Sequence, residues 1–322
     1  MAPLTPPPAR ALSLDALRGL AILAMCFSGV VPWSGLPSWM YHAQLPPPSR
    51  AFVPTLAGFT WVDLVFPAFL FCMGAAFPLA FASRFRKGLS RSAAAASMLW
   101  RGIGLLFFAV FVQHMAPYEL SSSPNVKTWL LALVGFAILF PIYMKLPEAW
   151  PSWKSIAVRT LGIAAALIFL GTNEWNGKPF SVQRVDIIIL FLANMALFGG
   201  LVWLVIGERP ERCLAAMALV AAGILAARMP NSPLQFFNEL ASALHLGWAF
   251  EFEYLRYLLV VLPGVLAGQV LQSWQNERVN EADVPPPPRL GLIVGAVAGL
   301  VVLTHTALQA RRRRHVGLVH PF

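Results

Sequence analysis

The sequence has 322 residues, of which 58% are hydrophobic and only 12% are charged, and its mean hydropathy is +0.66. Soluble domains use about 25% charged residues, so this composition excludes an ordinary soluble enzyme and predicts a polytopic membrane protein whose main partner is the lipid bilayer. The formal net charge is +10. In a membrane protein the placement of basic residues reflects the topology, so this excess does not indicate nucleic acid and we expect no nucleic-acid partner.

Nine segments of the chain are long and apolar enough to cross about 30 Å of hydrocarbon. Backbone groups in lipid must be hydrogen-bonded within their own segment, so we expect all of these segments to be helices. The predicted fold class is therefore all-α, with one polytopic helical domain at residues 12–308, an amino-terminal tail at 1–11 and a short basic tail at 309–322. In chain order the predicted spans are Leu12–Val31, Val62–Ala82, Met98–Met115, Trp129–Lys145, Ile156–Gly171, Val185–Gly207, Cys213–Arg228, Tyr254–Leu271 and Leu290–Leu308.

Arginine and lysine residues divide unequally between the two sides of this predicted bundle. With the amino terminus in the cytoplasm, a clear majority of them lie inside, as the positive-inside rule requires. The exception is Arg311–Arg314, which follows the ninth span and would lie outside. Either one span is miscounted or the chain is shortened at its carboxy terminus, and we favour the shortened chain. The charges therefore predict a multi-pass protein of a cytoplasmic membrane with its amino terminus inside.

The predicted outer loops and helix ends collect carboxylates, amides, imidazoles and indoles. These groups suit a sugar or glycan ligand, because sugars offer many hydrogen-bond donors and acceptors together with an apolar face that stacks on aromatic rings. The outer tryptophans also fit an interfacial belt, which stays open as the plainer explanation. The candidates for substrate binding are Gln44, Glu174, Arg184, Asp186, Glu251 and Arg256.

The predicted inner side is mostly basic. Guanidinium groups bind phosphates through two parallel hydrogen bonds, so the inner arginines would suit a phosphorylated cofactor. Each of these residues also has an alternative to cofactor binding. Arg84 and Arg86 would then serve only as topology determinants, and Arg18 would form a structural ion pair with Asp15 on the same helix face. The candidates for cofactor binding are Arg18, Arg84, Arg86 and Arg101.

Two motifs near the amino terminus carry a family resemblance. The first is Ser13–Gly19, with the sequence SLDALRG, and the second is Asp63–Phe71, with the sequence DLVFPAFLF, which Met73-Gly74 follows. Together with His42 in the intervening loop, they resemble the heparan-alpha-glucosaminide N-acetyltransferase family of multi-span membrane acyltransferases, in particular its bacterial branch. Weaker similarity to that branch covers Arg184–Ile189 and Leu255–Gly264.

The resemblance implies transfer of an acetyl or similar acyl group from cytoplasmic acyl-CoA, such as acetyl-CoA, to a glycan outside a bacterial inner membrane. It implies that His42 is the catalytic residue and Asp63 its partner. The residue types agree, because an imidazole can deprotonate the acceptor or carry the acyl group, and a carboxylate fixes the tautomer of the imidazole. We expect the chain to depart from the family in two respects: a Pro-rich segment, Leu45–Gly58, separates the histidine from the aspartate, and the chain is shortened at its carboxy terminus.

Two other functions remain open at this stage. A sugar permease or uptake component would carry its ligand into the cytoplasm without acyl-CoA, although we find no convincing internal repeat of the kind that many transporters have. A degenerate, non-catalytic relative would only bind a partner. No spacing of His and Cys residues fits a metal site, so we expect no bound metal. A homodimer is compatible with each of these functions.

Overall fold

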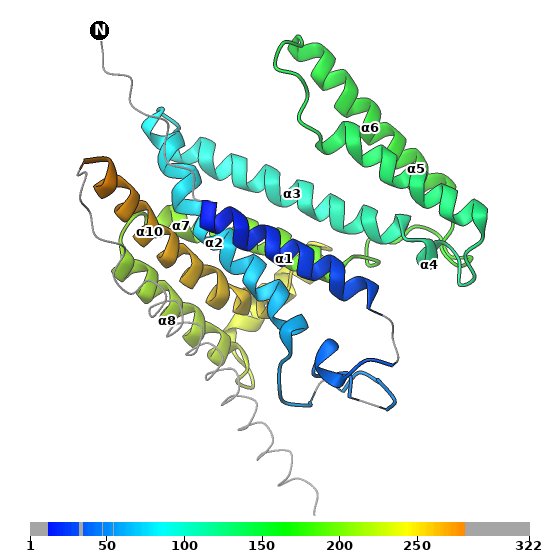
Figure 1. The fold of residues 1–322 in the computed structure, drawn as a ribbon, viewed down its shortest axis with the longest axis horizontal. Coiled ribbons are helices and arrows are strands. Elements are labelled where there is room, and N and C mark those ends of the chain that lie inside the picture. The colour runs from blue at the N-terminus through cyan, green and yellow to red at the C-terminus, as the bar shows by residue number, and fades with distance from the viewer. Residues whose placement is uncertain (1–11, 32–34, 47, 54, 281–322) are drawn as a thin grey trace, which may run out of the picture. The chain divides into compact units, whose positions relative to one another are not determined.

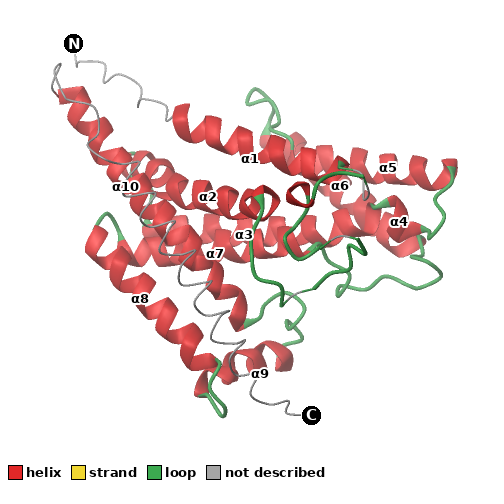
Figure 2. Cartoon of the chain, turned by 60° about the horizontal axis from the view of Figure 1, so that its bottom comes forward, coloured by secondary structure: helices red, strands yellow, loops and turns green. Residues whose placement is uncertain are grey.

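A computed structural model describes residues 12–31, 35–46, 48–53 and 55–280. Every regular element in these residues is a helix (Figure 2), and eight helices are long and apolar enough to cross a membrane. The fold class predicted from the sequence, a polytopic helical membrane protein, is therefore confirmed. The long helices are α1 (Leu12–Val30), α2 (Trp61–Arg86), α3 (Arg91–Met115), α5 (Val126–Tyr143), α6 (Ser152–Thr172), α7 (Ile187–Ile206), α8 (Pro210–Ala227) and α10 (Leu258–Asn280).

Eight of the nine predicted spans correspond to these long helices. The predicted ninth span, Leu290–Leu308, lies outside the described residues, as do both predicted tails. Helix α3 begins at Arg91, earlier than the predicted Met98, because the residues in between are mostly alanine, the strongest helix former. The short elements are η1 (Ser38–Met40), α4 (Pro117–Leu120), η2 (Pro233–Gln235), α9 (Phe236–Ala243) and η3 (Phe252–Tyr257).

The chain divides into two compact units. The first unit takes its residues from 1–99, 194–236 and 252–322, and the second from 100–193 and 237–251. Helices α3 and α7 contribute residues to both units. Both candidate catalytic residues, His42 and Asp63, belong to the first unit.

The most extensive helix contact of the first unit is formed by α2 and α10 (Figure 1). A Cβ atom at Gly74 would overlap the carbonyl of Val261, and one at Gly264 would overlap the carbonyl of Phe71. Gly268, four residues after Gly264, likewise faces the backbone of α2. Small residues at this spacing let two helix backbones approach closely in a membrane. Helix α2, which carries Asp63 in its first turn, is thereby fixed against α10.

Helix α1 packs antiparallel to α2. The ring of Phe27, near the end of α1, lies 5.7 Å from the ring of Trp61 at the start of α2. At the other end, Leu14 packs with Cys72 and Ala75. The loop between the two helices, which contains His42, therefore returns to the amino-terminal end of α2.

The core of the second unit consists of aromatic and aliphatic side chains from α3, α4, α5, α6 and the loop after α6. Helices α5 and α6 pack together as a hairpin (Figure 1). Trp175, in the loop after α6, is fully buried, and its indole N–H donates to the carbonyl of His114 at 2.6 Å. This bond ties the loop to the end of α3, because Met115 is the last residue of that helix.

Candidate functional site

The structure brings His42 and Asp63 into direct contact. Imidazole Nδ1 of His42 lies 2.5 Å from carboxylate Oδ1 of Asp63. The histidine side chain is 52% exposed, whereas the aspartate side chain is only 18% exposed. Among the described residues, the second imidazole nitrogen, Nε2, has no hydrogen-bond partner. The pair therefore presents one ring nitrogen to its surroundings and commits the other to the carboxylate.

The other carboxylate oxygen of Asp63 holds the backbone on both sides of the loop. Oδ2 accepts hydrogen bonds from the backbone N–H of Thr60 at 2.8 Å and of Ala43 at 3.1 Å. The hydroxyl of Thr60 donates to the carbonyl of Tyr41 at 2.6 Å. Asp63 is the third residue of α2, where a carboxylate that bonds the N-cap backbone stabilises the helix start. One side chain thus both caps α2 and orients His42.

The Pro-rich segment Leu45–Gly58 does not separate the two residues in space, because Gln44 closes it into a loop. The N–H of Val53 donates to the carbonyl of Gln44 at 2.8 Å. The side-chain amide of Gln44 donates to the carbonyls of Leu56 at 3.4 Å and Gly58 at 3.3 Å. This candidate for substrate binding therefore bonds its own loop, and it brings the chain back to Thr60 and α2.

Tyr41 and Arg50 belong to this site, although neither of them is among the residues predicted from the sequence. The Arg50 guanidinium carbon lies 3.4 Å from the centroid of the buried Tyr41 ring, and its Nη2 donates to the carbonyl of Leu36 at 2.9 Å. A cation over an aromatic face is attractive. Arg50 also has a φ of +50°, which is uncommon for a residue with a side chain. These contacts hold the backbone immediately before His42, and no local sequence pattern indicates them.

This arrangement has the chemistry of a general base. A carboxylate at Nδ1 favours the tautomer in which Nδ1 carries the proton, so Nε2 holds a lone pair. The same carboxylate stabilises the imidazolium that forms when Nε2 takes a proton. Such a base can act only on a group that reaches Nε2, and the exposure of His42 leaves this nitrogen accessible.

Arg256 is the other candidate for substrate binding in the first unit. Its Nη1 lies 3.4 Å from Oε1 of Glu253, and the same oxygen accepts from Nη2 of Arg228 at 2.6 Å. The next residue, Tyr257, packs its ring edge-on against Phe66 at 5.8 Å. Phe66 follows Asp63 by about one turn of α2. The charged cluster Arg228–Glu253–Arg256 is therefore connected to the start of α2 through the contact between these two rings.

The remaining candidates for substrate binding lie in the second unit. Arg184 places its Nε 3.8 Å from Oε2 of Glu119 and its guanidinium carbon 5.9 Å from the Trp175 ring. Asp186 caps α7, because its Oδ1 accepts from the N–H of Ile189 at 2.9 Å. Both side chains thus have local partners within their unit. The last two candidates, Glu174 and Glu251, are exposed.

Three of the four candidate cofactor arginines lie in the first unit, where they do not form one group. Arg84 and Arg86 are exposed in the last turn of α2. Arg18 lies one turn after Leu14, which packs with Cys72 and Ala75. Arg84 is therefore about three turns of α2, or about 18 Å, beyond the level of Cys72. Arg101 belongs to the second unit.

Comparisons with known proteins assign the chain to a family. The helices and their apolar lengths define a multi-pass membrane protein. The chain belongs to the family described as "Domain of unknown function (DUF5009)", whose model matches residues 10–271. This match covers every long helix of the structure except the last residues of α10. No curated protein and no solved structure matches the chain.

Proposed function

We propose that this protein is a membrane acyltransferase that moves an acetyl or similar acyl group from acyl-CoA to a sugar or glycan. The observation that carries the proposal is the contact of 2.5 Å between His42 and Asp63. The loop that Gln44 closes brings these two residues together, although they are far apart in the sequence. The resemblance of Ser13–Gly19 and Asp63–Phe71 to the heparan-alpha-glucosaminide N-acetyltransferase family supports the same reaction.

In the proposed reaction, His42 is the general base and Asp63 its positioning partner. The acyl end of a cytoplasmic acyl-CoA extends through the protein to His42 in this proposal. Nε2 of His42 takes the proton from a hydroxyl or amino group of the acceptor as that group attacks the thioester carbonyl carbon. The new C–O or C–N bond replaces the C–S bond, and His42 returns its proton to the departing thiolate. Asp63 accepts the Nδ1–H bond throughout, which keeps the lone pair on Nε2 and stabilises the imidazolium.

The proposal includes an orientation, with the amino terminus in the cytoplasm of a bacterial cell and His42 on the outer side of its inner membrane. The excess of arginine and lysine that this orientation places inside supports it. A cysteine at Ser49, in a variant without the three native cysteines, should react with an impermeant thiol reagent on intact cells. A cysteine at Ser90 should stay protected. Both positions are exposed in the structure, so the reverse labelling pattern would invert the orientation.

The test of the function is a direct one with the full-length protein purified in detergent. We expect it to bind acetyl-CoA and to release CoA only when an amino sugar or glycan acceptor is added, with a stoichiometric acetylated product. An absence of acetyl-CoA binding would exclude this class of enzyme. Uptake of a labelled sugar into vesicles without CoA release would instead identify a permease.

A further inference from the structure

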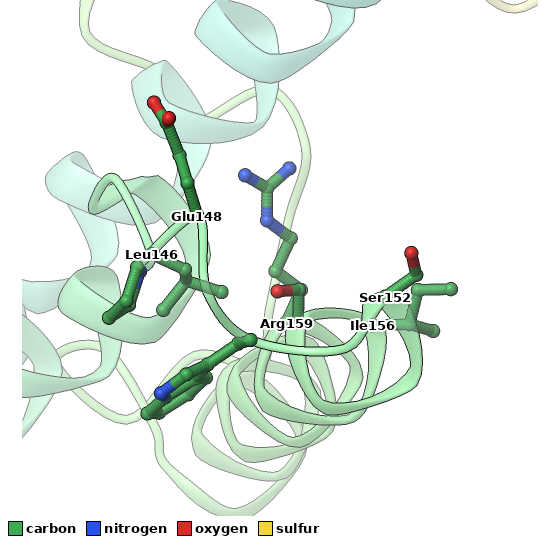
Figure 3. Close-up of a pocket in the computed structure, with 8 residues that line it drawn as sticks. Leu146, Glu148, Ser152, Ile156 and Arg159 are labelled. Atoms are coloured by element: carbon green, nitrogen blue, oxygen red, sulfur yellow. The ribbon is translucent and has the colours of Figure 1, made fainter.

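The turn between α5 and α6 contains a hollow that the proposed reaction does not use. Its volume is about 360 Å³, and it lies between the turn residues 146–150 and one face of α6 (Figure 3). The lining residues on α6 follow the spacing i, i+3, i+4 and i+7, which places them on the same face of the helix. They are Ser152, Ser155, Ile156 and Arg159.

The charge that remains in this hollow is positive. The carboxylate of its lining residue Glu148 is already paired with Lys145 at 2.8 Å. Within the described part of the chain, Arg159 has no ion pair. Side chains on a helix tilt toward its amino-terminal end, and this tilt directs Arg159 back toward the turn. In Figure 3 its guanidinium and the Glu148 carboxylate extend to the same side.

Residues with hydrogen-bond donors also line the hollow. Ser152 and Ser155, which carry hydroxyl groups, are among the lining residues. Ser152 is also the first residue of α6, and the first N–H groups of a helix have no partner within it. An arginine, two hydroxyls and the positive end of a helix dipole together favour an anion with several acceptor oxygens.

The position of the hollow and its apolar residues indicate which anion. The hollow lies in a turn that joins two membrane-spanning helices, so it lies at the boundary between hydrocarbon and water. Leu146, Trp150 and Ile156 add apolar and indole surface to the lining, and tryptophan favours the level of the lipid headgroups. A volume near the lower limit for ligand pockets suits a headgroup whose acyl chains stay in the bilayer.

From these observations we infer that the α5–α6 turn is a binding site for the phosphate ester of an anionic phospholipid, held by Arg159, Ser152 and Ser155. A soluble phosphate ester has the same charged group, but it would leave the apolar part of the hollow empty. The inference is independent of the acyl-transfer proposal, since none of these residues takes part in that reaction.

The experiment uses the full-length protein in detergent, titrated with phosphatidylglycerol while its thermal unfolding midpoint is followed. We expect phosphatidylglycerol to raise the midpoint and phosphatidylcholine to raise it much less. Arg159→Gln should weaken phosphatidylglycerol binding by about tenfold, the factor for one lost charge-assisted contact. Lys154→Gln is the matched control, because Lys154 lies on the same helix over the Trp153 ring and does not line the hollow. It should change binding by less than about twofold.

Several results would overturn this assignment. Equal loss of binding in Arg159→Gln and Lys154→Gln would mean that diffuse surface charge, and no specific site, attracts the lipid. Full displacement of the lipid by inorganic phosphate, glycerol phosphate or CoA would make the ligand a soluble phosphate ester. Should Arg159→Gln fail to fold, Ser155→Ala and Arg159→Lys provide the comparison, and lipid binding unchanged in both would exclude the site.

Discussion

Two histidines in this protein, His42 in the first unit and His114 in the second, have opposite surroundings. His42 is 52% exposed and bonds a carboxylate at 2.5 Å. His114 is completely buried, and its Nδ1 lies 2.7 Å from the carbonyl of Val110, one helical turn earlier. The imidazole of His114 also packs edge-on against Trp175 at 4.6 Å, and the ring of Phe180 lies 4.9 Å away at a tilt of 38°.

The difference shows what separates a reactive histidine from a structural one. A general base needs a nitrogen that substrate can reach and a partner that stabilises the charged ring. His42 has both, because Asp63 supplies the charge and the exposed side of the ring supplies access. His114 has aromatic neighbours and a neutral backbone partner, which favour a neutral ring that fills space. The residue type is the same, so burial and partner chemistry decide the role of each histidine.

The largest effect that we expect concerns the buried histidine. His114→Ala should lower the free energy of unfolding by about 3 kcal/mol, because it removes a buried ring and leaves a cavity beside Trp175. Unfolding in mixed detergent micelles would measure the loss. His114→Phe keeps the ring volume and should cost only about 1 kcal/mol for the missing hydrogen bond. Wild-type stability of the alanine variant would show that His114 is no packing residue.

The second prediction concerns the exposed histidine. His42→Ala should reduce acyl transfer by at least about a hundredfold, the lower range of a general acid–base contribution, while acyl-CoA binding stays normal. Unfolding stability should change by less than about 0.5 kcal/mol, as is usual for exposed positions. His245 provides the control: it is exposed with a φ of +56°, and His245→Asn, which tolerates that conformation, should leave transfer intact. Transfer at the wild-type rate by His42→Ala would refute the catalytic role.

The third prediction separates the two functions of Asp63. Asp63→Asn should lower acyl transfer by about tenfold, less than His42→Ala, because the aspartate orients the ring through one charged hydrogen bond and does not react. Asp63→Ala should also destabilise the helix start by about 1 kcal/mol, since the bonds to Thr60 and Ala43 are lost. If both variants lost stability but kept full transfer, Asp63 would be only a helix cap.

Much of the fold follows from the sequence, because the thickness of the bilayer imposes the length of each span. The local signal for the start of α2 is equally readable, with Thr60 followed three residues later by Asp63. Bilayer thickness leaves the packing of the helices open, and the close contact of Gly74 with α10 emerges only from the structure.

The candidate site is less readable from the sequence for a physical reason. Only the family resemblance indicates the pairing of His42 with Asp63. The loop that brings the two residues together is closed by backbone bonds, such as Val53 N–H to Gln44 C=O, and such bonds leave no pattern of side chains in the sequence. Gln44 and Asp186 were selected as polar residues of the outer side, yet both bond nearby backbone groups. A sequence shows that a side chain is polar but not whether its own loop already satisfies it.

The smallest predicted effect concerns Asp15 and Arg18 on α1, a second pair of a carboxylate with a basic side chain. It tests whether such a pair is by itself evidence of a functional site. Their side chains are 39% and 34% exposed, and Arg18 Nη1 lies 3.8 Å from Asp15 Oδ1. A partly exposed pair at i and i+3 contributes only about 0.5 kcal/mol. Asp15→Asn should therefore lower the unfolding free energy by no more than that and leave acyl transfer unchanged, as measured in the assays used for His42. A loss above about 1 kcal/mol would mean that the pair contributes to folding, and a raised KM for acyl-CoA would mean that it takes part in cofactor binding. In either case, the exposure of an ion pair would not suffice to distinguish functional from incidental pairs in this protein.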